Sequence, residues 1–204
     1  MLGDSLAPAL ASHCSLDRTP PASQHYCSVQ EIVSTSWDRR LADELITELE
    51  MYTGERRSVR EMRKFLALKA CRGLLDRLQS ARRDKTSRQA LRSVAHAMRE
   101  YALERPILAA SALRPPTTDC LEWNEAHARL NEFMIDLLAE CGVYDNAANT
   151  ALCTLRSLVR GFVLHEVLNS FLATYSYADA YDGAIDVFIA GISVLSNVDQ
   201  RGGC

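Results

Sequence analysis

The stretch NAANTALCTLRSLVRGFVLHEVLNSF, residues 146–171, decides the fold. Its apolar residues recur in steps of three and four, the spacing that places side chains on one side of an α-helix. They are Leu152, Leu155, Leu158, Val159, Phe162, Val163, Val167, Leu168 and Phe171. This set is too wide for one packing seam, so we expect one face against the same chain and another against a second chain. Because glycine within a helix costs about 1 kcal/mol relative to alanine, Gly161 indicates either close approach of another group or a tolerated glycine.

The rest of the chain shows the same helical period, with no alternating strand pattern of useful length. The expected helices are 37–52, 58–79, 87–104, a short helix after Pro106, a helix that ends at Gly142, and 179–195. Ser58 with Glu61 three residues later forms a capping box, and Asp119 with Glu122 repeats the pattern. Asp145 or Asn146 is suited to cap the deciding helix. We therefore predict an all-α fold, a helical bundle.

The first of these helices has an apolar side and, opposite it, a strongly acidic outer face. The apolar side is formed by Trp37, Leu41, Leu45, Ile46, Leu49 and Tyr52. Prolines at positions 8, 20 and 21 precede this helix, and no apolar period survives among residues 1–27, so we expect a mobile leader there.

Composition bounds the class of protein. The chain has 204 residues, of which 48% are hydrophobic and 24% charged, as in an ordinary globular protein. No apolar run reaches the roughly 18 residues of a membrane span, and the start lacks a secretory pattern, so we expect a cytoplasmic protein without a membrane partner. Seven cysteines without a C-x-x-C pair favour reduced thiols over disulfides or a metal site. Cys71 and Cys153 are either oxidant sensors or small buried apolar residues.

Charge is distributed unevenly along the chain. Residues 56–99 carry fourteen basic and three acidic side chains, whereas residues 1–55 carry three basic and nine acidic ones. Residues 100–204 carry six basic and fourteen acidic side chains. This pattern indicates either a surface for a polyanion or a solvated helical surface balanced by acidic parts of the same fold.

No arrangement typical of catalysis is visible in the sequence. There is no Ser/His/Asp order, phosphate-binding loop or paired carboxylate set. Asp136 and Glu140 share one helix face, which is more typical of solvated surface than of acid–base chemistry. We therefore predict that the chain is not an enzyme and needs no cofactor.

Several segments together resemble a known family. The run ALRSVAHAMREYALERPILAASALRPP, residues 90–116, is similar to the first ligand-domain helices of TetR/AcrR bacterial transcriptional regulators. The segment LRSLVRGFVLHE, residues 155–166, resembles the subgroup whose C-terminal domain is named for a Trp-His-Gly motif, although only Gly161 of that triplet is present. The ending IAGISVL, residues 189–195, matches in type and position, so the resemblance covers residues 58–195.

The resemblance implies a homodimer joined through the last two long helices and a cavity for a small, largely apolar effector. The expected interface residues are Leu155, Leu158, Phe162, Ile185, Phe188, Ile189 and Ile192. Aromatic, sulfur and histidine side chains on the apolar faces are the candidates to line the cavity, with ordinary core packing as the alternative for each. They are Met98, Tyr101, Trp123, His127, Phe133, Phe162 and His165.

The resemblance also implies a DNA-binding region ahead of the linking helix at 58–79. Residues nearest DNA would be Arg56, Arg57, Arg60, Arg63 and Lys64. Residues 28–57 are acidic and lack the family's Leu-Tyr-x-His sequence; the most similar pair is Met51-Tyr52. Because phosphates repel an acidic surface, we expect a divergent, degenerate or missing helix-turn-helix there. We accordingly divide the chain into the leader 1–27, this region, a ligand-binding and dimerisation domain at 58–195, and a tail at 196–204.

Three functions stay open at this point. A TetR/AcrR-like regulator that binds a small effector fits the resemblance best. The alternative is a dimeric ligand-binding or interaction module that has no operator of its own. A helical enzyme is the third, and no visible catalytic set supports it.

Overall fold

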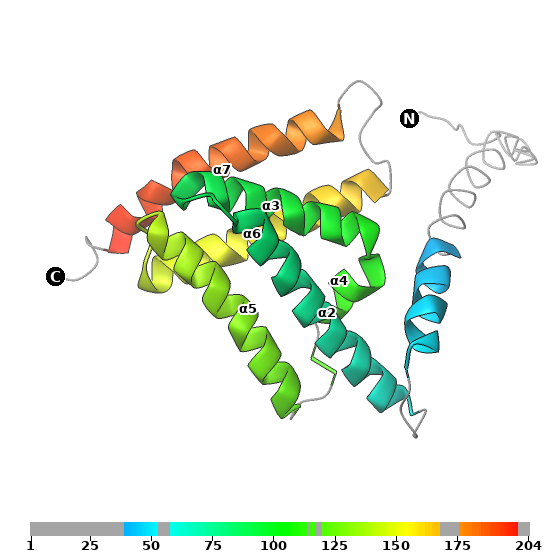
Figure 1. Cartoon of the computed structure of the whole chain (residues 1–204). Helices are drawn as coiled ribbons and strands as arrows, with labels where there is room; N and C mark the ends of the chain where they lie inside the picture. The colour runs from blue at the N-terminus through cyan, green and yellow to red at the C-terminus, as the bar shows by residue number, and fades with distance from the viewer. Residues whose placement is uncertain (1–38, 53–57, 114, 117–119, 168–175, 200–204) are drawn as a thin grey trace, which may run out of the picture.

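The described part of the chain is helical throughout. The computed structural model describes residues 39–52, 58–113, 115–116, 120–167 and 176–199, and among them there is no strand. A helix at residues 39–50 precedes α2 (Val59–Arg82), α3 (Ser87–Glu104), α4 (Pro106–Ala112), α5 (Leu121–Glu140), α6 (Asp145–Val167) and α7 (Tyr177–Asp199) (Figure 1). The predicted all-α fold is confirmed, and none of the described helices is both long and apolar enough to cross a membrane.

Several predicted helix ends are confirmed at the level of hydrogen bonds. The Ser58 hydroxyl accepts from the Glu61 amide at 3.2 Å and caps α2. Pro106 opens α4 in its first turn, where the missing N–H leaves no helical bond unmade. Gly142 ends α5 with φ +82°, and the next amide, of Val143, donates to the Leu138 carbonyl at 3.0 Å. These two residues form a Schellman motif, which favours glycine because the left-handed position clashes with a Cβ.

Other expectations need correction or lie beyond the described residues. α5 begins after Cys120, whose side chain makes no capping bond, and Asp119 is not described. α2 continues past the expected residue 79 to Arg82, and α7 begins at Tyr177 rather than 179. The leader, Arg56, Arg57 and the end of the deciding stretch from residue 168 also lie outside the described residues.

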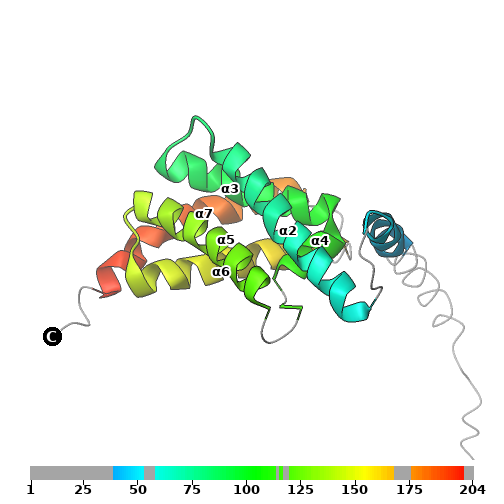
Figure 2. The same cartoon turned by 60° about the horizontal axis from the view of Figure 1, so that its bottom comes forward.

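Two helices, α2 and α5, run parallel and are joined by ion pairs at both ends. Lys64 and Glu122 meet at 2.6 Å near the start of both helices, and Arg82 pairs with Glu140 near their ends. In Figure 1 both helices run from the bottom of the picture toward the upper left, and Figure 2 shows the same pair with the bottom of that view turned forward. Their facing apolar side chains, with those of α3, α4 and α6, form the core.

The last helix, α7, packs antiparallel on α3 around one aromatic side chain. Tyr181 is fully buried and donates its hydroxyl proton to the Ala95 carbonyl at 2.7 Å. His96 lies 3.1 Å from Asp182, and one turn away Arg92 pairs with Asp186. These contacts fix the register of α7, which also packs against α6.

The helix at 39–50 docks on the junction of α3 and α4 (Figures 1 and 2). Glu44 accepts from the first free amides of α4, those of Ile107 at 2.8 Å and Leu108 at 3.4 Å, where the helix dipole favours an anion. Glu48 is fully buried, 2.6 Å from Lys69 and paired with Arg105. The predicted outer acidic face is therefore wrong for these two residues, because the partly exposed cations Lys69 of α2 and Arg105 of the α3–α4 junction draw them inward.

Candidate functional site

The residues predicted to line a cavity fall into separate groups. Tyr101 lies between α2 and α3, and its hydroxyl donates to the Ala70 carbonyl at 3.4 Å. Burial raises the pKa of Tyr101 to about 12. A Cβ on Gly73 would stand 3.1 Å from this hydroxyl, so a larger residue at position 73 would have to displace the tyrosine side chain slightly. This tyrosine is a packing residue of the α2–α3 contact.

A second group lies between α5 and α6. The rings of Trp123 and His127 stack with centroids 4.6 Å apart and planes 19° apart. His127 Nδ1 lies 3.2 Å from the amide nitrogen of Asn131, whose oxygen accepts from Arg156 Nη2 at 2.5 Å. Burial, and secondarily the charge of Arg156, lowers the pKa of His127. We call Trp123, His127, Asn131 and Arg156 the donor cluster.

The remaining predicted pocket residues lie elsewhere. Phe162 meets the Tyr181 ring edge-on at 5.4 Å, in the contact of α6 with α7. Phe133 lies under the guanidinium of Arg82, 5.6 Å from its carbon, near the end of α2. Met98 is half-buried against the core, and His165 is exposed. The structure therefore brings together Trp123 and His127, whereas Tyr101, Phe133 and Phe162 lie in other helix contacts.

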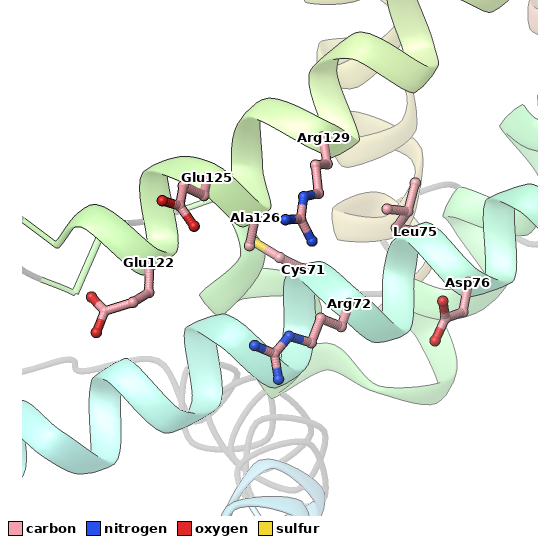
Figure 3. A pocket seen from close by; sticks show the side chains of 8 residues that line it. All are labelled: Cys71, Arg72, Leu75, Asp76, Glu122, Glu125, Ala126 and Arg129. Atoms are coloured by element: carbon pink, nitrogen blue, oxygen red, sulfur yellow. The ribbon is translucent and has the colours of Figure 1, made fainter.

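A groove of about 330 Å³ lies between α2 and α5 (Figure 3). Its lining residues are Cys71, Arg72, Leu75 and Asp76 of α2 and Glu122, Glu125, Ala126 and Arg129 of α5. In Figure 3 the Arg129 side chain reaches from α5 toward α2, where the Cys71 sulfur lies at the floor of the groove. Because carboxylates and guanidiniums alternate along an open groove, it has no single charge with which to select a ligand.

The thiol in this groove is shielded rather than activated. Cys71 is buried and donates weakly to the Ala112 carbonyl, with sulfur and oxygen 3.6 Å apart. Burial raises the pKa of this thiol to about 11. A protonated, enclosed thiol is a poor nucleophile, which favours the apolar-packing alternative over oxidant sensing for this residue.

Most of the predicted interface side chains are buried by their own chain. Leu155, Ile185, Phe188 and Ile192 belong to the core, each at most 8% exposed. The other three, Leu158, Phe162 and Ile189, are half-buried against it. The core takes the α6 residues because α3, α5 and α7 enclose that helix, and it takes the α7 residues because α7 packs against α3 and α6. A second chain would therefore meet the outward neighbours of these residues.

Of the twelve described basic side chains in the block 56–99, six are matched by carboxylates in space. Lys64, Lys69, Arg77, Arg82, Arg92 and Arg99 all form ion pairs with acidic residues. This arrangement favours the alternative in which a solvated helical surface is balanced within the fold. Of the residues expected nearest DNA, Lys64 is engaged with Glu122, while Arg60 and Arg63 are exposed.

Sequence reasoning overlooked Arg156 and Asn131, and one signal was available for the arginine. Arg156 follows Leu155 and precedes Val159, so it stands within the apolar stripe of α6. A charged residue on the buried face of a helix is unusual and typically needs a partner. No local pattern identifies that partner, because Asn131 lies 25 residues away in sequence.

Comparison with protein families matches residues 91–188 to the tetracyclin repressor-like C-terminal domain. These residues extend from the start of α3 into α7 and include the whole donor cluster. A comparison with curated protein sequences gave no match. Residues 91–188 therefore resemble a tetracyclin repressor-like C-terminal domain.

Proposed function

We propose that the chain is a TetR/AcrR-type transcriptional regulator that acts as a homodimer and responds to a small, largely apolar effector. The observation that carries the proposal is the family match over residues 91–188, since this kind of domain serves TetR regulators as the effector-binding part. We assign effector binding and dimerisation to residues 58–195, and we place the protein in the cytoplasm.

The outer surface of α6 and α7 supports dimerisation. Leu164, Val187 and Val194 are 55%, 74% and 61% exposed. Gly183 and Gly191 lie on the same side of α7 as the two valines, and nothing stands within 4 Å of where their Cβ atoms would be. Exposed apolar residues beside glycines, whose backbone no side chain covers, form a flat apolar surface. A second copy of the chain can pack against this surface and exclude water from it.

Sedimentation velocity with a charged substitution tests this interface. Val187→Glu should convert dimers to monomers, because a dimer would have to bury the unpaired carboxylate. The control is Val59→Glu, which places the same charge on a valine of α2 that is 61% exposed and outside the proposed interface. An unchanged dimer in Val187→Glu, or a monomeric wild-type protein, would refute the proposed interface.

Gel-shift titration at several salt concentrations tests the regulator itself. Specific binding that weakens steeply with salt is expected for an operator-binding dimer. The second candidate, a dimeric module without its own operator, is favoured by one observation. The described helix of region 28–57 carries acidic residues, and two of them, Glu44 and Glu48, hold it against α2 and the α3–α4 junction. Weak, sequence-independent binding would support the module.

A further inference from the structure

Arg156 differs from the other enclosed cations of the described chain in lacking an acidic partner. Arg99 has a side chain 13% exposed and pairs with Glu166 at 2.7 Å. Lys69 and Arg105 share Glu48. The half-buried Arg156 instead donates to the neutral amide oxygen of Asn131, and no carboxylate among the described residues forms an ion pair with it.

The polar groups around Arg156 that are still free to bond are hydrogen-bond donors. Since the Asn131 oxygen accepts from Arg156, the Asn131 nitrogen donates to His127 Nδ1. The neutral imidazole then carries its proton on Nε2, which makes that atom a donor. The indole N–H of Trp123, stacked on His127, is buried and has no acceptor in the described chain. The cluster thus offers the guanidinium and two ring N–H groups, and its acceptors are already used.

Enclosing Arg156 and the Trp123 N–H without an acidic partner or a free acceptor costs free energy, and a bound anion would remove that cost. Taking a guanidinium out of water without a counter-charge is unfavourable, and leaving a buried N–H without an acceptor adds to that cost. Burial accordingly lowers the pKa of Arg156. A carboxylate is planar and accepts two parallel N–H bonds from arginine, so it supplies both the missing charge and the missing acceptors.

We propose that the donor cluster binds the carboxylate of the effector, which makes the effector a small organic acid with an apolar or aromatic body. Arg156 supplies the charge, and His127 and Trp123 add donors and a flat aromatic surface between α5 and α6. This inference rests on the proposed effector-binding function and narrows its ligand from a largely apolar molecule to an apolar acid.

Calorimetric titration of the full chain with benzoate and with benzamide tests the charge requirement. The two probes have the same ring and nearly the same shape, but only benzoate carries a negative charge. Benzoate should bind at least about tenfold more tightly, since hydrogen bonds to a charged acceptor are about twice as strong as neutral ones. Equal binding of both probes, or binding of neither, would overturn the inference.

The variant Arg156→Met separates recognition from structure. It should lose at least about tenfold in benzoate affinity, while the ligand-free protein melts at the same or a higher temperature, because a half-buried charge without a counter-charge has been replaced by an apolar chain of similar length. The control Arg129→Met removes an exposed arginine of α5 and should change neither property. A lower melting temperature in Arg156→Met, or unchanged benzoate binding, would overturn the inference.

The tests of carboxylate binding and the tests of the proposed function can fail independently of each other. Dimer mass and operator binding are measured without any probe and do not depend on Arg156. A dimeric, operator-binding protein that does not distinguish benzoate from benzamide keeps the regulator assignment and loses the carboxylate assignment. A monomer that binds benzoate through Arg156 gives the opposite result.

Discussion

Replacing Glu48 with glutamine should release the helix at 39–50 from the rest of the protein. Glu48 is the buried charged residue of the described core, fully enclosed, with Lys69 at 2.6 Å and Arg105 as its ion-pair partners. Glutamine keeps the size of the side chain and one acceptor oxygen but removes the charge that both cations share. The two cations then face a neutral group across a buried contact.

The magnitude follows from the exposure of the partners. Removing one member of a buried ion pair costs about 3–5 kcal/mol when the other stays buried. Here the side chains of Lys69 and Arg105 are 33% and 40% exposed, so water partly solvates them after the change. Allowing for that screening, we expect a loss of about 2–3 kcal/mol, which is a factor of roughly 30 to 150 in the docking equilibrium.

Native-state hydrogen exchange is the appropriate assay, because it resolves one helix from the whole fold. Amides of residues 44–50 should exchange roughly 30 to 150 times faster in Glu48→Gln, in proportion to the docking equilibrium, while those of α3, α6 and α7 keep their protection. The control is Glu50→Gln, which makes the same change at an exposed position of the same helix. Equal exchange in the two variants would refute the role assigned to the buried carboxylate.

Three further predictions concern single side chains. Tyr181→Phe should lower the free energy of unfolding by about 1–3 kcal/mol in urea titration, because a buried carbonyl loses its donor; Tyr144→Phe, 60% exposed, should change it little, and equal losses would contradict this. With a thiol reagent at pH 8, exposed Cys153 should react at once and Cys71 only on unfolding, since burial raises the pKa of Cys71 to about 11. The pKa of His127 is lower in the folded protein than its ordinary value of 6.5, so below pH 6.5 the unfolded chain binds more protons than the folded one. The stability that neutral His127 contributes is therefore lost as pH falls from 6.5 toward its folded pKa. Urea midpoints from pH 7.5 to 5.5 should therefore vary less in His127→Gln than in wild type, and identical slopes would contradict the assignment.

Local features of the sequence account for the helices and for most of their ends. The three-and-four spacing of apolar residues, the Ser58 cap, Pro106 and Gly142 are local features, and each acts through hydrogen bonds or steric limits within a few residues of itself. The resemblance seen in residues 90–116 and 155–166 likewise agrees with the family match over 91–188.

Which helix faces lie inside and which charges have partners depends on how the helices pack in space. The period of α6 marks Leu155 as apolar, but whether it meets its own chain or a second one depends on how α3, α5 and α7 enclose it. An ion pair depends equally on distance in space, so Glu48 finds two cations while Arg156 meets a neutral amide. Both outcomes arise from contacts between residues far apart in the chain, and no local sequence pattern encodes such contacts.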